Sequence, residues 1–164
     1  MMGEIFWSEL TIGIQDRGEF ARVIIRLVAA ILLGAVVGIQ REQAGKPAGL
    51  RTHILVALGT ALFVIASVGS GMTSDGVSRV IQGLASGIGF IGAGAILKLS
   101  KSREIQGLTT AAGIWMTAAI GVAVGLGALG LAILGTILTW LVLAAIGRME
   151  ARVPKKADPT DGAA

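Results

Sequence analysis

The sequence predicts an all-α membrane protein, a bundle of five transmembrane helices with the N-terminus outside and the C-terminus in the cytoplasm. Of its 164 residues, 54% are hydrophobic and only 15% are charged, and the mean hydropathy is +0.80. A soluble domain of this size has too few charges to cover so much apolar surface. The 25 glycines point the same way, because small residues let membrane helices approach closely.

Five apolar runs follow one another along the chain, each close to the roughly 20 residues that cross a hydrocarbon core of about 30 Å. They are residues 23–39, 52–68, 80–97, 108–124 and 128–146. Only Gly125-Leu126-Gly127 joins the last two, which predicts a tight hairpin rather than one long span. The predicted membrane domain therefore covers residues 23–146.

Two short segments flank this domain. Residues 1–22 have no basic start and no early apolar run, so they do not resemble a signal peptide. Their apolar side chains fit either a helix lying on the membrane surface or a frayed tail: Ile5, Phe6, Trp7, Leu10 and Ile14. Residues 147–164 form a tail that begins basic and ends small and polar, and we expect its last ten residues to be disordered.

The positions of Lys and Arg predict the orientation, since short cytoplasmic loops collect basic residues. With the N-terminus outside, ten basic residues fall on the cytoplasmic side: Arg41, Lys46, Arg51, Lys98, Lys101, Arg103, Arg148, Arg152, Lys155 and Lys156. The other four fall outside: Arg17, Arg22, Arg26 and Arg79. The net charge of +4 is thus a topology signal, and no nucleic-acid partner is expected.

The chain also carries a possible internal repeat. A shift of 58 residues places Gly34-Ala35 on Gly92-Ala93, and Gly49-Leu50 with Thr52 on Gly107-Leu108 with Thr110. Such a repeat would relate two parallel helix pairs about an axis near the membrane normal. Chance matching in a chain rich in Gly and Ala is the alternative.

The two cytoplasmic loops are the predicted functional region. The first crowds charged residues beside turns set by Gly45, Pro47 and Gly49, which predicts a shaped surface suited to docking a partner. The alternative is a set of solvated topology signals. The candidate residues of both loops are Arg41, Glu42, Lys46, Arg51, His53, Arg103, Thr109 and Thr110.

A second polar cluster is expected on the outer side. It comprises Arg26, Asp75, Arg79 and Gln82, and Arg26 would either reach outward or pair with Asp75 or Glu19. No Asp or Glu lies inside any apolar run, so a carboxylate pathway for Mg²⁺ or protons is poorly supported. With one histidine and no cysteine, the sequence predicts no metal site, no cofactor and no enzyme activity.

Glycines in the first and third runs predict helix packing. Gly34 and Gly38 form one GxxxG pair, and Gly83 and Gly87 form another. Gly87, Gly89 and Gly92 also spell a dinucleotide-binding pattern, which we reject because it lies inside a membrane span. A helix broken between Gly87 and Gly94, lining a transport path, is the alternative reading of this run.

Four segments together resemble the MgtC/SapB family of bacterial inner-membrane proteins. They are GIQRE, GKPAGLRTHILVALG, SRVIQG with SGIGFIGAGAILK, and QGLTTAAGIWMTAAIGVAVGLG. The resemblance implies a five-span domain and a role in adaptation to Mg²⁺ limitation, acid stress or survival inside host cells. For some members it implies restraint of the F-type ATP synthase rather than Mg²⁺ import.

Two departures from the family pattern matter. Gln40 stands where Glu is common before Arg41-Glu42, and the C-terminal cytoplasmic domain of many relatives has no counterpart before Ala164. We therefore expect a non-enzymatic regulator in the inner membrane, forming a homo-oligomer and docking on a membrane complex. A small oligomeric channel or transporter is the alternative.

Overall fold

The computed structural model describes residues 2, 3, 5, 17–98 and 105–150. Within these residues the chain forms five helices: α2 (Arg17–Gln43), α3 (Leu50–Gly69), α4 (Ser74–Gly94), α5 (Leu108–Gly125) and α6 (Leu129–Glu150). A two-residue antiparallel pair, β1 (Leu97–Lys98) and β2 (Ile105–Gln106), lies between α4 and α5. The predicted helical bundle is confirmed. The predicted surface helix and the C-terminal tail beyond Glu150 fall almost wholly outside the described residues.

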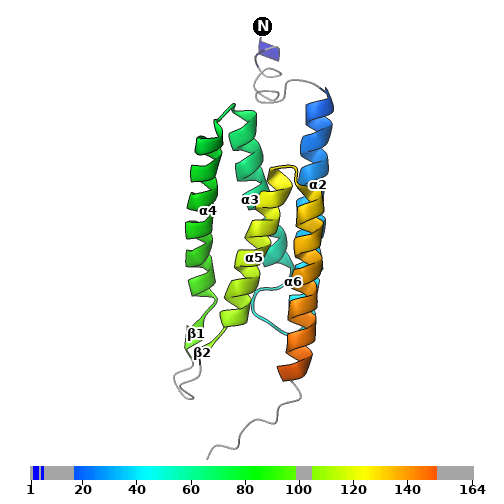
Figure 1. Ribbon diagram of the computed structural model, residues 1–164, viewed down its shortest axis with the longest axis vertical. Helices are drawn as coiled ribbons and strands as arrows, with labels where there is room; N and C mark the ends of the chain where they lie inside the picture. The colour runs from blue at the N-terminus through cyan, green and yellow to red at the C-terminus, as the bar shows by residue number, and fades with distance from the viewer. Residues whose placement is uncertain (1, 4, 6–16, 99–104, 151–164) are drawn as a thin grey trace, which may run out of the picture.

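The helices run alternately up and down the bundle (Figure 1). We call one end the loop end: it holds the α2–α3 loop, the β1/β2 pair and the last turn of α6. The opposite end, the turn end, holds the start of α2 and the α3–α4 and α5–α6 connections. The two loops with candidate docking residues therefore begin and end on the same side of the bundle.

The helix boundaries differ from the apolar runs where polar residues continue or cap a helix. α2 begins at Arg17, six residues before the first run. α4 begins at Ser74 because the Thr73 hydroxyl accepts a hydrogen bond from the Gly76 amide at 3.3 Å, and it ends at Gly94. A hydropathy pattern does not reveal helix caps of this kind.

Three helices are long and apolar enough to cross a membrane: Gly18–Gln43, Leu50–Gly69 and Leu108–Gly125. In α6 the described side chains form a shorter apolar stretch, Leu129–Ala145. α4 is less apolar than these helices, because its first turns contain the polar residues Ser74, Asp75, Ser78 and Arg79. Three of the five predicted spans therefore have the helix length and the apolar composition that membrane crossing requires.

Glycines with positive φ shape the connections. Gly127 has φ +83° in the turn between α5 and α6, which confirms the predicted hairpin. Gly107, at φ +97°, precedes α5, and a Cβ there would collide with the Ala95 carbonyl. This second glycine brings the end of α4 against the start of α5.

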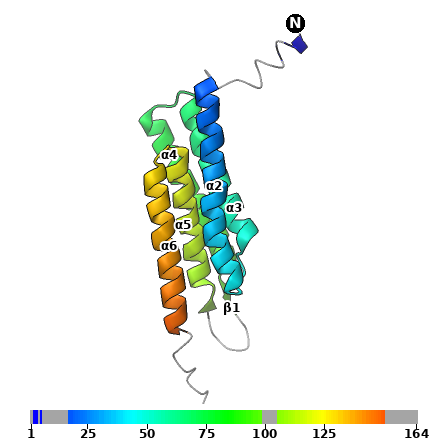
Figure 2. The same ribbon diagram turned by 90° about the vertical axis from the view of Figure 1, so that its right-hand side faces the viewer.

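α5 lies at the centre of the bundle and packs on α2, α3, α4 and α6, while α3 packs on α2, α4 and α5 (Figures 1 and 2). Small side chains such as Ala57, Ala61 and Val64 on α3 are fully buried there. α4 packs on α5 and α3 but buries only Ile88 and Gly92. The bundle is thus tightly packed where α3 meets α2 and α5, and it is open around α4.

The structure agrees with the 58-residue repeat. α3 and α5 begin at Leu50 and Leu108, which the shift superimposes. A Cβ on Gly34 would meet the His53 carbonyl at 2.8 Å, and a Cβ on Gly92 would meet Ala111 at 3.5 Å. These are equivalent contacts, because the shift takes Gly34 to Gly92 and His53 to Ala111.

Candidate functional site

Arg41 lies in the last turn of α2 and points into the bundle. Its side chain is only 3% exposed, and its Nη2 donates a hydrogen bond of 3.1 Å to Thr110 Oγ1 in the first turn of α5. Its Nε has no acceptor in the described part of the chain. The expectation that Arg41 is an exposed docking charge is therefore wrong: it is a buried cation that ties α2 to α5.

His53 sits beside this contact and is completely buried. Its Nδ1 lies 2.7 Å from Thr117 Oγ1, while the Thr117 hydroxyl donates to the Gly113 carbonyl at 2.9 Å. Which of the two groups donates in the His53–Thr117 contact depends on the imidazole tautomer. His53 Nε2 is buried and makes no hydrogen bond within the described residues.

We call Arg41, His53, Thr110 and Thr117 the polar cluster. It joins three helices near the loop end, and each of its side chains is at most 3% exposed. The sequence indicated Arg41, His53 and Thr110 but not Thr117, whose signal was its place seven residues after Thr110 on one face of a helix. Thr109, which precedes Thr110, is exposed.

The other described candidate residues of the first loop, Glu42, Lys46 and Arg51, are exposed at the loop end. Glu42 Oε2 accepts a hydrogen bond of 2.8 Å from the Leu50 amide, so this carboxylate caps the start of α3. Lys46 and Arg51 are exposed, in the loop and in the first turn of α3. Arg103 of the second loop lies outside the described residues.

The outer-side candidates do not form one cluster around Arg26. The half-buried Arg26 donates from Nη1 to the Gly125 carbonyl at 3.0 Å, which ties α2 to the end of α5. Asp75, Arg79 and Gln82 are exposed on α4. Within the described residues no bond joins any of these three to Arg26, so the predicted Arg26–Asp75 pairing is not found.

The candidate glycines fall into two groups. Gly34 and Gly38 of α2 are buried, and a Cβ on Gly38 would lie 2.7 Å from Leu50 Cα. This GxxxG pair therefore packs closely on another helix, and the structure identifies that helix as α3. Gly92 has ordinary contact distance to Ala111. The positions with no neighbour within 4 Å are Gly83, Gly87, Gly89 and Gly94. The second GxxxG pair therefore does not pack on another helix among the described residues.

Two glycines of α5 that pack as closely as Gly34 and Gly38, or more closely, were not predicted from the sequence. A Cβ on Gly121 would collide with the Thr60 hydroxyl and the Ala57 carbonyl, and one on Gly125 would lie 2.7 Å from Val64 Cβ. Both belong to α5 and pack on α3. Their own GxxxG spacing was the available signal, but it lay inside a uniformly apolar run.

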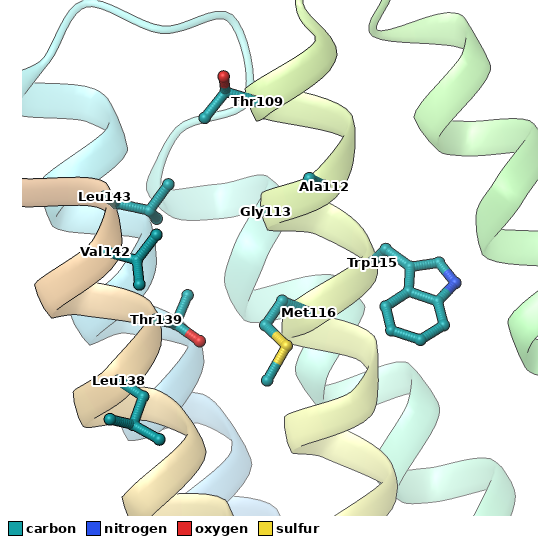
Figure 3. A pocket seen from close by; sticks show the side chains of 9 residues that line it. All are labelled: Thr109, Ala112, Gly113, Trp115, Met116, Leu138, Thr139, Val142 and Leu143. Carbon is teal, nitrogen blue, oxygen red and sulfur yellow. The ribbon is translucent and has the colours of Figure 1, made fainter. Parts of the chain in front are cut away.

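An apolar groove runs between α5 and α6 on the outside of the bundle (Figure 3). Its volume is about 630 Å³, within the range of small-molecule pockets. Met116 points between the two helices, and Trp115 points away toward α4. The lining residues are Thr109, Ala112, Gly113, Trp115, Met116, Leu138, Thr139, Val142 and Leu143.

The chain matches known proteins over most of its length. Residues 27–152 match the model of the MgtC family. SrpB of Synechococcus elongatus is 42% identical over 145 residues, covering 82% of this chain and 80% of SrpB. The "Putative magnesium transporter YhiD" of Escherichia coli K12 is 43% identical over 143 residues, covering 83% of this chain.

MgtC of Salmonella typhimurium is 44% identical over 115 residues, covering 70% of this chain. The matched part of this chain spans 66% of YhiD and 48% of MgtC. No solved structure matches the chain. By the family model and by these relatives, the chain belongs to the MgtC family.

Proposed function

We propose that this protein is a non-enzymatic, multi-pass protein of the bacterial inner membrane that adapts the cell to Mg²⁺ limitation or to acid or host stress. It acts by docking on another membrane complex, and the F-type ATP synthase is the candidate partner. Family membership supports the link to Mg²⁺. The observation that carries docking is the pair of exposed cations Lys46 and Arg51 at the loop end.

Exposed charges of this kind suit recognition rather than stability. An exposed loop charge adds little to folding stability, but charges at the rim of an interface raise the encounter rate and make association depend on salt. Lys46 stands beside Pro47 and Gly45, whose φ is +65°, so its backbone is held in a defined turn. The burial of Arg41 removes it from this surface, and Lys46 and Arg51 remain.

An oligomeric channel or transporter is the second candidate. The name given to YhiD favours it, as does the open glycine face of α4. Against it, no Asp or Glu occurs within the apolar runs to coordinate a cation at membrane depth. The same open face of α4 supports our proposal that the protein forms a homo-oligomer.

Two measurements test these proposals. In inverted membrane vesicles, the wild-type protein should change the rate of ATP synthesis, and Lys46→Glu and Arg51→Glu should abolish that change. Arg79→Glu, an exposed arginine near the turn end, is the matched control and should behave as wild type. No effect of the wild-type protein on ATP synthesis would remove this partner, and Mg²⁺, H⁺ or K⁺ flux through the pure protein in liposomes would favour the transporter.

A further inference from the structure

The guanidinium of Arg41 is a buried charge whose hydrogen-bonding capacity is mostly unused. It is 3% exposed, and its hydrogen bond within the described residues goes to a neutral hydroxyl, that of Thr110. Its Nε–H has no acceptor there. Arginine stays charged in proteins, and a buried charge is strongly destabilising unless an opposite charge accompanies it.

The bond to Thr110 places this guanidinium at the start of α5. A helix start carries free backbone N–H groups and a partial positive charge. The residue before α5 is Gly107, which offers no side-chain cap, and the first turn contains no acidic residue. A buried cation and a positive helix end therefore lie side by side.

The start of α3 is the equivalent position in the first repeat, and there a negatively charged group accepts a hydrogen bond from the helix. Leu50 is equivalent to Leu108 in the 58-residue repeat, and its amide donates to the Glu42 carboxylate at 2.8 Å. In the first repeat an oxyanion thus neutralises the helix start. In the second repeat the described residues supply a cation instead.

We propose that Arg41 and the first turn of α5 form a binding site for a phosphate oxyanion, which either an anionic phospholipid head group or free phosphate can supply. The planar guanidinium matches phosphate geometry through Nε–H and a second N–H. The Thr110 hydroxyl accepts from Arg41 and keeps its own proton to donate. Phosphate is favoured over carboxylate because Arg41 lies two residues before the end of α2, at the depth of lipid head groups if α2 spans the membrane.

This site is separate from the exposed docking charges. Lys46 and Arg51 lie at the same end of the bundle but are exposed, whereas Arg41 is buried. Arg51→Gln therefore removes the same charge from the same end without touching the site. Loss of docking and loss of phosphate binding can be distinguished by these two arginines.

The experiment uses the full chain, purified and delipidated in neutral detergent. Inorganic phosphate or phosphatidylglycerol should raise the melting temperature by roughly 5 °C at saturation, relative to chloride of equal ionic strength or phosphatidylcholine. Arg51→Gln should keep this rise and Arg41→Gln should lose it. A response to phosphatidylglycerol alone identifies the lipid head group, and a response to inorganic phosphate identifies the free anion.

Arg41→Gln can fail to fold, so a milder variant accompanies it. Thr110→Val keeps the side-chain volume but removes the hydroxyl, and it should weaken phosphate binding roughly tenfold by loss of one hydrogen bond, measured by ³¹P NMR line broadening. Three results would overturn the proposal: no response of the wild-type protein to either phosphate source, an unchanged response in Thr110→Val and Arg41→Gln, or an equal response to succinate.

Discussion

Single residues decide how closely the helices of this bundle approach, and Gly121 is the clearest case. Its missing side chain makes room for the Thr60 hydroxyl and the Ala57 carbonyl on α3. Thr60 in turn donates to the Val56 carbonyl at 2.8 Å, so its position is fixed by its own helix. A backbone neighbour on one side and a tethered side chain on the other leave no room for a methyl group.

Gly121→Ala should therefore destabilise the protein by about 1–3 kcal/mol, the usual cost of forcing an extra methyl group into a packed core. Gly59→Ala is the matched control, since a Cβ at Gly59 meets nothing within 4 Å. That second change should be neutral or stabilising, because Ala favours helix by about 0.5–1 kcal/mol over Gly. Thermal unfolding in detergent measures both, and equal melting temperatures would contradict close packing at Gly121.

Arg26 makes a second contact that depends on one side chain. Arg26 donates a hydrogen bond to the carbonyl of Gly125, the last residue of α5. Carbonyls at a helix C-terminus lack the backbone N–H donors that a further turn would supply. Arg26→Met keeps the apolar stem but removes the donors, and should cost roughly 1.5–3 kcal/mol, the range for a hydrogen bond to a charged group.

Arg22→Met, one turn earlier and exposed, is the control for Arg26→Met. It should leave chemical unfolding unchanged. If the two variants unfold at the same denaturant concentration, the bond between Arg26 and Gly125 contributes nothing to the fold.

The helices differ in whether their glycines contact a neighbouring helix. Those of α2 and α5 face α3, but those of α4 at Gly83, Gly87 and Gly94 face open space. The three fall on one stripe at helical spacing, with the exposed Phe90 among them. α4 is thus the element available for contact with a second copy.

Gly87→Leu should leave the monomer folded and reduce homo-oligomer formation, because the new side chain enters no space occupied within the chain. Gly38→Leu should prevent folding, since even its Cβ would lie 2.7 Å from Leu50 Cα. Size-exclusion chromatography with light scattering, together with thermal unfolding, separates the two effects. Loss of folding in Gly87→Leu would contradict an open α4 face, and an unchanged assembly in that variant would exclude this stripe as the contact between copies.

At the scale of the molecule, the loop end and the turn end should lie on opposite sides of the membrane. The chain has no cysteine, so single cysteines report cleanly. A cysteine replacing exposed Lys46 should resist a membrane-impermeant thiol reagent added to intact spheroplasts, and one replacing exposed Asp75 should react. The reverse labelling would invert the topology and place the candidate docking charges outside the cell.

The sequence by itself determined the helical bundle, the α5–α6 hairpin and the family. These follow from long apolar runs, from the glycines at 125 and 127, and from motifs that lie close together in the chain. Hydropathy did not determine where α2 and α4 begin, because polar residues extend the first and a threonine caps the second. These local sequence patterns reflect local interactions, and local interactions determine whether a segment forms a helix.

The tertiary structure decided which charges and glycines are buried. Arg41 and Lys46 are five residues apart and both basic, yet one lies against Thr110 and the other is exposed. The pair Gly83 and Gly87 has the same spacing as Gly121 and Gly125, yet only the second pair meets another helix. Burial depends on which distant segment lies opposite a side chain. Arg41 and Thr110 are 69 positions apart in the sequence, so only the packing of α2 on α5 could bring them together.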